Sequence, residues 1–293
     1  MSQPKVLITG SNGLLGQELR KVFSQNNFFV IATGIGADRS KYQSNVYVEM
    51  DVTSSEQCKS VLYKYMPSVI INAAAMTNVD NCERNQKKCC EVNLNSANNL
   101  LPYLKEHQPH FIQISTDFIF NGSKGWYLEE DEPDPLNYYG FCKLEYEKLI
   151  TMSCVKYTII RTSLIYGSTI EHNNFLSWVK STMANSEKID VVYDQYRTPT
   201  YVFDLAFIIS KIINMKKYGI FHISSGEKLS IFDIVCNIAS CYGLNSKMIN
   251  KIDSNSLNQF AQRPMDTSLQ IDKAIKTLKF KPTKLINALT DIS

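Results

Sequence analysis

The sequence predicts an α/β protein with a doubly wound parallel sheet and a smaller, mixed carboxy-terminal lobe. Short runs rich in β-branched residues alternate with helical patterns up to about residue 161, as expected for a parallel sheet wound with helices. A glycine-rich turn joins the first strand to the first helix. Beyond residue 161 the alternation becomes irregular, and 293 residues are enough for one large domain with an appended lobe.

The spacing of the apolar residues predicts each element. Residues 5–9 (KVLIT) form the apolar run of a buried strand, and Leu19, Val22 and Phe23 then recur at helical spacing. Pro67 ends a helix that begins near residue 55, because proline cannot continue a helix. The expected strands cover residues 5–9, 28–32, 46–49, 69–72, 111–115, 157–161 and 220–223. The expected helices cover residues 16–25, 55–65, 89–106, 138–152, 174–183 and 231–242.

Composition and charge exclude several classes of protein. Apolar residues make up 44% and charged residues 20%, which is ordinary for a globular protein. The net charge is only +3 and the basic residues are scattered, so we expect no nucleic-acid partner. No apolar run approaches the ~18 residues that span a bilayer, which predicts no membrane association. The amino terminus leads straight into a strand without a signal-peptide pattern, so we expect a cytoplasmic protein.

The eight cysteines and four histidines show no metal-binding pattern. None of the cysteines forms a C-x-x-C pair, and the histidines lie far from any cysteine cluster. We therefore expect no metal site and free thiols.

The glycine-rich turn has the pattern of a phosphate-binding loop. Gly10, Gly13 and Gly16 follow a strand and precede a helix, with the spacing G-x-x-G-x-x-G. Glycines allow a tight turn and a close approach of the backbone to a pyrophosphate, whose charge lies at the positive end of the helix. A glycine-rich turn alone is often only a turn, but the order of strand, loop and helix favours a dinucleotide site.

Two other segments are candidates for the same site. Ala73, Ala74 and Ala75 close the fourth strand and leave room for a flat ligand, although small residues also serve close packing of a helix on a sheet. Asp51 and Val52 follow the third strand, where a carboxylate could accept a hydrogen bond from an adenine amino group. Asp51 could equally open a turn or cap the helix that begins near residue 54.

A hydroxyl group at a strand end and a tyrosine–lysine pair on the next helix are the candidate catalytic groups. Tyr139 and Lys143 are spaced i, i+4 on an expected helix, which places them on one face. Ser115, Thr116 and Asp117 end the preceding strand, and the carboxyl ends of strands form the ligand crevice of open α/β sheets. A hydroxyl of this segment and the Tyr139–Lys143 pair could therefore converge on one carbonyl group, with the ammonium lowering the pKa of the phenol. The Tyr-x-x-x-Lys spacing alone, however, is also that of a chance surface pair.

The chain resembles the extended short-chain dehydrogenase/reductase family, and within it the dTDP-4-dehydrorhamnose reductase group. The resemblance covers nearly the whole chain and implies a Rossmann-like fold. The segments that carry the resemblance are residues 10–16, 72–75, 78–80, 115–120, 135–143, 161–163 and 194–200 with Arg263-Pro264.

The resemblance implies a role for each matching residue. Tyr139 becomes the general acid, Lys143 its partner and a ribose-binding residue, and Thr116 the hydroxyl that holds the substrate carbonyl. The expected cofactor-binding residues are Gly10, Asn12, Gly13, Leu14, Leu15, Gly16, Arg39, Asp51, Val52, Ala73, Ala74, Ala75, Asn93, Tyr139 and Lys143. The expected substrate-binding residues are Thr77, Thr116, Asp117, Phe118, Tyr139, Arg197 and Arg263. The dinucleotide-binding domain would cover residues 1–166 and 199–223, and the substrate lobe residues 167–198 and 224–293.

The implied activity is NAD(P)H-dependent reduction of a 4-keto-6-deoxy sugar nucleotide, such as dTDP-4-dehydrorhamnose to dTDP-rhamnose. NADPH is expected in preference to NADH, because the second strand ends without a carboxylate and Arg39 follows, although Asp38 stands beside it. Phe118 and Arg197 depart from the family pattern and leave the sugar and its nucleotide open. Family members often form homodimers. The alternative is a non-enzymatic regulatory protein that resembles the beta subunit of methionine adenosyltransferase.

Overall fold

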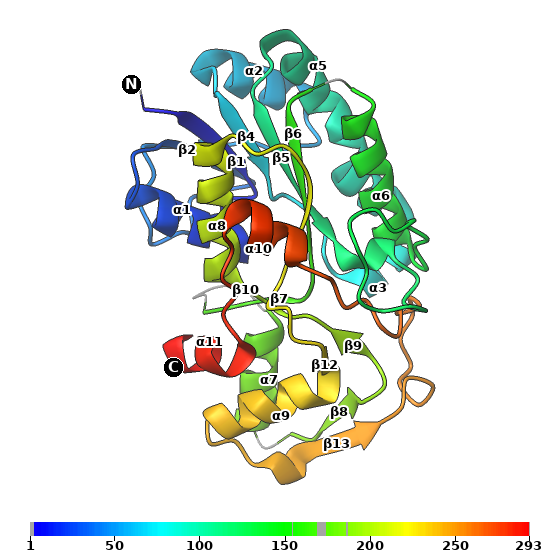
Figure 1. The fold of residues 1–293 in the computed structure, drawn as a ribbon. Helices are drawn as coiled ribbons and strands as arrows, with labels where there is room; N and C mark the ends of the chain where they lie inside the picture. The colour runs from blue at the N-terminus through cyan, green and yellow to red at the C-terminus, as the bar shows by residue number, and fades with distance from the viewer. Residues whose placement is uncertain (1–2, 154, 169–173, 186, 293) are drawn as a thin grey trace.

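A parallel sheet forms the centre of the molecule. The computed structural model describes residues 3–153, 155–168, 174–185 and 187–292. Seven strands lie in the order β11-β6-β5-β4-β1-β2-β3, and all neighbouring pairs are parallel (Figure 1). The order reverses between β1 and β4, which is where open α/β sheets bind ligands. The strands are β1 (Lys5–Thr9), β2 (Phe29–Gly34), β3 (Val46–Glu49), β4 (Val69–Asn72), β5 (His110–Thr116), β6 (Tyr157–Thr162) and β11 (Gly219–Ile223).

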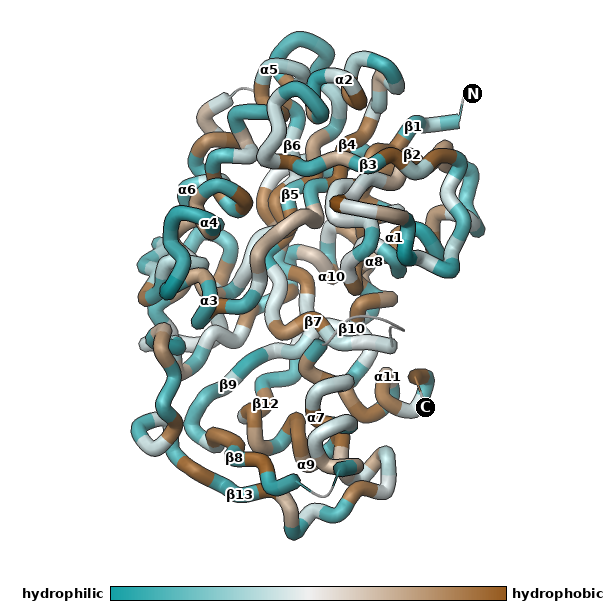
Figure 2. Tube along the Cα trace, turned by 180° about the vertical axis from the view of Figure 1, so that it is seen from behind, coloured by the Kyte–Doolittle hydropathy of each residue, from teal (hydrophilic) through white to brown (hydrophobic). Residues whose placement is uncertain are grey.

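Helices cover both faces of this sheet, which confirms the predicted doubly wound fold. Alternate residues of β1 point to opposite faces, so Val6 and Ile8 belong to one apolar cluster and Leu7 to another. Figure 2 shows apolar residues running along the central strands between the two helix layers. The first face is covered by α1 (Leu14–Ser24), α8 (Val202–Met215) and α10 (Asp272–Leu278). The second face is covered by α2 (Ser55–Tyr65), α5 (Ala97–His107) and α6 (Tyr138–Thr151).

The single helix expected over residues 89–106 is interrupted. The chain forms α3 (Val79–Arg84), α4 (Gln86–Cys90) and a π-helical turn, η1 (Glu91–Asn95), before α5 begins. The wide turn directs Asn93 inward, where its amide group donates to Met76 O and accepts from Met76 N, both at 2.9 Å. A buried amide needs such partners, and this pairing stabilises the wide turn.

The smaller lobe contains a mixed set of short strands and helices around its own apolar cluster, visible below the sheet in Figure 1. β8 (Ile189–Val192) pairs in parallel with β13 (Ile249–Ile252), while β9 (Tyr196–Arg197) pairs antiparallel with β12 (Leu229–Ser230). At the junction with the sheet, β7 (Ile165–Tyr166) pairs in parallel with β10 (Thr200–Tyr201). The lobe helices are α7 (Phe175–Ala184), α9 (Ile231–Cys241) and α11 (Leu285–Ile292), with a short 3₁₀ turn, η3 (Ser246–Met248). Another 3₁₀ turn, η2 (Asp117–Ile119), directly follows β5 of the sheet.

Helices α3, α8, α10 and α11 were not predicted from the sequence. α8 packs beside α1 on the same face of the sheet, and its exposed side also carries Phe203 and Phe207, so apolar residues on nearly every side hide its helical period. The segment 271–280, which contains α10, packs in the cluster of the sheet although it lies within the range expected for the lobe. Part of the carboxy-terminal segment therefore packs on the large domain.

Among the described residues, no helix is long and apolar enough to cross a membrane. The same residues contain no group of three or more histidine, cysteine or acidic side chains arranged to hold a metal ion. The seven described cysteines are free thiols, while Cys154 and His172 lie outside the described residues.

Candidate active site

The phosphate loop is held tightly against the end of β4. Gly10 has a φ of +64°, and a Cβ there would lie 2.8 Å from Ala74 Cα. At Gly16 a Cβ would lie 2.4 Å from Gly10 O, so both positions require glycine. Thr9 Oγ1 accepts a hydrogen bond from Ala74 N at 3.1 Å and donates one to Asn72 Oδ1 at 2.6 Å. The loop and the Ala73–Ala75 segment therefore form one backbone surface at the switch point of the sheet.

Asn12 fixes the loop that follows β2. Its Nδ2 donates to Ala37 O at 3.0 Å, and its Oδ1 accepts from Arg39 N at 3.0 Å. The Arg39 side chain is exposed. Asp38 turns away and accepts two hydrogen bonds from buried Arg20, at 2.6 and 2.8 Å, which hold the pKa of Asp38 below its usual value. The carboxylate beside Arg39 is thus already neutralised within the protein.

The segment after β3 is occupied by local contacts. Asp51 Oδ1 accepts from Thr53 N and Thr53 Oγ1, both at 2.8 Å, so Asp51 opens the turn ahead of α2. Val52 and Leu15 are buried with their side chains in the two apolar clusters of the sheet. Val52 O accepts from Asn99 Nδ2 at 2.8 Å. Leu15 and Val52 can therefore contribute to a ligand site through their backbone only.

Thr116, Tyr139 and Lys143 meet at the carboxyl end of β5. Asn137 caps α6 by accepting from Gly140 N at 2.9 Å, which starts the helix directly before Tyr139. Gly140 lets the first turn of α6 press onto the strand end, since a Cβ there would lie 2.2 Å from Phe118 O. Thr116 lies close enough to Tyr139 to affect the pKa of its phenol, while Thr116 Oγ1 donates to Asp117 Oδ1 at 3.2 Å.

The electrostatics of this triplet differ from the expectation. Burial lowers the pKa of Lys143 to about 8, and its Nζ donates to Ile114 O at 2.5 Å. Burial also raises the pKa of Tyr139, while Thr116 opposes that shift. The prediction that the ammonium lowers the phenol pKa is wrong for this arrangement. Desolvation of the phenol dominates, and the ammonium is bound to a backbone carbonyl of β5.

Asp117 and Arg197 form a buried junction between the sheet and the lobe. Asp117 Oδ2 accepts from Ser163 Oγ at 2.8 Å and from Thr267 Oγ1, and lies 3.9 Å from Arg197 Nε. Burial raises the pKa of Asp117, and Arg197 opposes that shift. The Arg197 guanidinium lies 5.0 Å from the Phe118 ring centre, and the same ring makes an edge contact with Tyr139.

The expected substrate residue Arg197 is thus inside the protein. Its guanidinium donates to Tyr196 O at 2.7 Å and to Pro264 O at 3.0 Å, which holds the segment before Met265. Arg263 is nearer the surface, where it pairs with Asp80 at 2.9 Å. Thr77 is exposed in the loop before α3. The structure therefore places Arg263 and Thr77, but not Arg197, where a ligand could reach the side chain.

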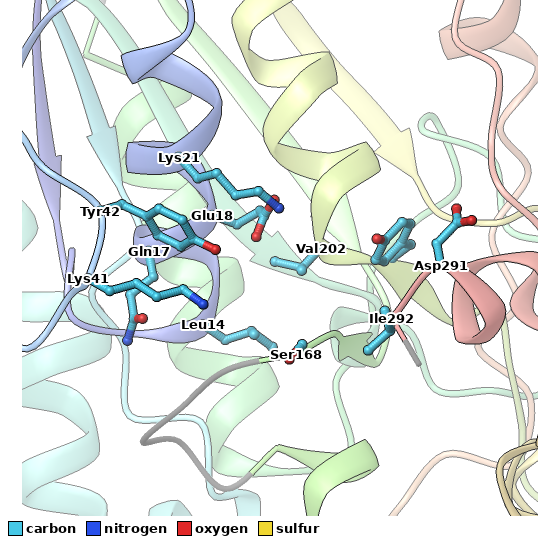
Figure 3. Close-up of a pocket in the computed structure, with 11 residues that line it drawn as sticks. Leu14, Gln17, Glu18, Lys21, Lys41, Tyr42, Ser168, Val202, Asp291 and Ile292 are labelled. Atoms are coloured by element: carbon cyan, nitrogen blue, oxygen red, sulfur yellow. The ribbon is translucent and has the colours of Figure 1, made fainter. Parts of the chain in front are cut away.

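A cavity of about 140 Å³ lies beside α1 and is separate from the catalytic triplet (Figure 3). Leu14 and Gln17 face it from α1, and Asp291 and Ile292 face it from α11. Leu14 is one of the expected cofactor residues, so the cavity adjoins the phosphate loop rather than the strand end that carries Thr116.

Glu147 and Arg161 were not predicted as site residues. Both are buried, and their side chains pair at 2.8 Å beside the triplet. A signal for Glu147 was present in the spacing, because it continues the i, i+4 series of Tyr139 and Lys143. Arg161 lies on a strand, and only the fold brings it to that helix.

Together, the doubly wound sheet, the glycine loop at its switch point and the triplet at the end of β5 define an extended short-chain dehydrogenase/reductase, a class of oxidoreductases. Within this class, the chain belongs to the family described as the RmlD substrate binding domain, whose family model matches residues 4–293.

The relatives include reductases and a methionine adenosyltransferase subunit. A dTDP-4-dehydrorhamnose reductase of Aggregatibacter actinomycetemcomitans is 30% identical over 300 residues, covering 98% of this chain and 98% of the relative. Methionine adenosyltransferase 2 subunit beta of Bos taurus is 28% identical over 276 residues, covering 92% of this chain and 81% of the relative. A crystal structure of dTDP-4-dehydrorhamnose reductase from Bacillus anthracis in complex with NADP matches with a TM-score of 0.88 at 27% identity, covering 99% of this chain and 98% of that one.

Proposed function

We propose that the protein is an NADPH-dependent reductase of a nucleotide-linked 4-keto-6-deoxy sugar, with dTDP-4-dehydrorhamnose as the substrate to test first. The observation that carries this proposal is the meeting of Thr116, Tyr139 and Lys143 at the strand end next to the switch point. The reductase relatives and the NADP complex support it. We also propose that the protein is a cytoplasmic homodimer. Its dinucleotide-binding domain would cover residues 1–166 and 199–223, and its substrate lobe residues 167–198 and 224–293.

The phosphate loop fits a dinucleotide. Gly13 begins α1 without a side-chain cap, so the first backbone N–H groups of the helix have no side-chain acceptor at that end. Gly10 and Gly16 keep the loop free of Cβ atoms where the backbone packs most closely. Both features suit a pyrophosphate at the positive end of the helix. When bound, the reduced nicotinamide would supply the hydride.

The residues of the triplet have separate tasks in the proposed reaction. Tyr139 would donate its phenolic proton to the substrate oxygen as negative charge develops there. Thr116 would donate a second hydrogen bond to the same oxygen. Burial raises the pKa of Tyr139, so the phenol is protonated at neutral pH, as a general acid in the reducing direction requires. Lys143 would hold the ribose hydroxyls, as the resemblance implies.

The preference for NADPH should depend on Arg39. We expect the wild type to have a higher kcat/KM with NADPH than with NADH, and Arg39→Ala to reduce that ratio by about 10-fold through loss of a charge-assisted hydrogen bond. Lys41→Ala removes a neighbouring cation, which lies over the Tyr42 ring, and serves as the control with a smaller effect. Equal efficiency with both cofactors in the wild type, or an unchanged ratio in Arg39→Ala, would refute this assignment.

The nucleotide diphosphate of the substrate should lie near Arg263. We expect Arg263→Ala to raise the KM for the sugar nucleotide by about 10-fold, because a charged hydrogen-bond donor is lost, and to leave the KM for NADPH nearly unchanged. Steady-state kinetics with each ligand varied in turn measure both constants. Equal effects on both ligands would mean that the Arg263–Asp80 pair only holds the fold.

The test of the function itself is oxidation of NADPH in the presence of a panel of 4-keto-6-deoxy sugar nucleotides linked to dTDP, UDP or GDP. Turnover with one member establishes the reaction and names the nucleotide. The likeness to the methionine adenosyltransferase subunit defines the competing result. Binding of NADPH with no turnover of any sugar would favour a regulatory protein.

A further inference from the structure

One face of α6 makes three successive contacts with the end of β5. Tyr139 lies beside Thr116, and Lys143 Nζ donates to the carbonyl oxygen of Ile114 at 2.5 Å. One turn further along, the Glu147 carboxylate accepts a hydrogen bond from the hydroxyl of Ser115. The tyrosine, the lysine and the glutamate are spaced four residues apart, so one stripe of the helix contacts three consecutive residues of the strand.

Glu147 is anchored from a second strand. Its side chain is 3% exposed, and Arg161 on β6 donates to Oε2 from Nε at 3.2 Å and from Nη2 at 2.8 Å. Arg161 stands opposite Ser115 in the parallel register of β5 and β6, so both groups reach the carboxylate from one side. The remaining guanidinium nitrogen, Nη1, donates to Glu129 O at 3.0 Å. A forked pair of this kind fixes the carboxylate in one position.

Glu147 is the only carboxylate among the groups that oppose the effect of burial on Lys143. Burial lowers the pKa of Lys143 to about 8, and the Glu147 carboxylate raises it, with smaller contributions from Cys89 of α4 and Cys142 of α6. On the other side of Glu147, the positively charged Arg161 of β6 pairs with its carboxylate. The carboxylate that opposes this shift thus lies one turn further along the same helix.

We propose that Glu147, held by Arg161 and Ser115, is a positioning residue that keeps Lys143 in its charged form against the carbonyl of Ile114. The catalytic consequence rests on the proposed function, in which Lys143 acts beside Tyr139. The charge state of Lys143 is a property of the protein alone and can be measured without substrate or cofactor.

Glu147→Gln retains the shape of the side chain and removes its charge. We expect the pH at which Lys143 titrates, followed by NMR of its ¹³Cε and Hε signals, to fall by about one unit or more from the wild-type value, as typical for loss of a nearby opposite charge. Lys143→Arg assigns the signal. A group that must stay charged loses function as the pH rises through its pKa, so the alkaline limb of the kcat profile should move to lower pH by the same amount.

Glu145→Gln is the matched control, because Glu145 lies on the same helix but pairs with exposed Lys148 at 2.7 Å. It should shift neither the NMR titration nor the pH profile. An unchanged titration of Lys143 in Glu147→Gln would overturn the proposal, even if kcat fell, because that result describes a structural role.

The double variant Glu147→Gln with Arg161→Met covers the case in which Glu147→Gln does not fold, since it removes the Arg161 guanidinium together with the carboxylate that pairs with it. In this variant too, the pH at which Lys143 titrates should be lower than in the wild type. An unchanged midpoint would again refute the proposal. A wild type that never oxidises NADPH refutes the proposed function instead, while the NMR titration still decides the role of Glu147.

Discussion

Tyr139→Phe should lower kcat by about 10²–10⁴-fold, the usual contribution of general acid catalysis. The change removes one oxygen atom and keeps the ring, which makes an edge contact with Phe118 at 6.4 Å. The partner hydroxyl of Thr116 ends β5 and would remain, but a threonine hydroxyl is a far weaker acid than a phenol. Steady-state measurements of NADPH oxidation with the substrate at saturation give kcat.

Tyr138→Phe is the matched control for this prediction. Tyr138 precedes Tyr139 on the same helix, and its hydroxyl contacts Cys90 rather than Thr116. We expect it to keep kcat within a few-fold of the wild type. Thr116→Val should cost less than Tyr139→Phe, because it removes a hydrogen bond but no acid. Lys143→Ala should lower kcat and also weaken cofactor binding. A Tyr139→Phe protein with wild-type kcat would rule out the assigned acid.

The second large effect concerns stability. Asp117→Asn leaves the buried guanidinium of Arg197 without its carboxylate, and breaking a buried pair typically costs about 3–5 kcal/mol. We expect about 3 kcal/mol here, because the closest atoms are 3.9 Å apart and an amide can keep the hydrogen bond from Ser163. Urea unfolding should show a lower midpoint with an unchanged m value.

Asp131→Asn is the corresponding surface control. Asp131 pairs with Lys124, whose side chain is half exposed, and such pairs contribute about 0–1 kcal/mol. If Asp117→Asn costs no more than Asp131→Asn, the junction between the sheet and the lobe does not depend on this pair. A large loss confirms that the charge of Arg197 serves the fold rather than a ligand.

Local patterns in the sequence predicted the elements that build the site. The glycine spacing of residues 10–16 reflects close backbone approaches, and these occur at Gly10 and Gly16 as required. The i, i+4 spacing of Tyr139 and Lys143 is a property of any helix, so it predicted a shared face without knowledge of the fold. The alternation of strands and helices along the chain likewise predicted the parallel sheet, because both patterns can be read locally.

Contacts between distant residues decided the remainder. Arg197 could be placed at the surface or inside from its sequence alone, and its contact with Asp117 depends on how the lobe packs on the sheet. The sequence placed Asp38 beside Arg39, but only the fold shows that its carboxylate pairs with Arg20.

For the triplet, too, local spacing in the sequence and packing in the fold decide different properties. Sequence spacing placed the ammonium of Lys143 on the face of Tyr139, but burial sets the direction of both pKa shifts, and burial is a property of packing. Glu147 carries the signal of its spacing in the sequence, yet its partner Arg161 comes from another strand. The sequence by itself thus determined which groups share a helix face or a strand end, because helix and strand periods are local. Only the tertiary structure decided which charges are buried and paired, because burial and pairing depend on residues far apart in the chain.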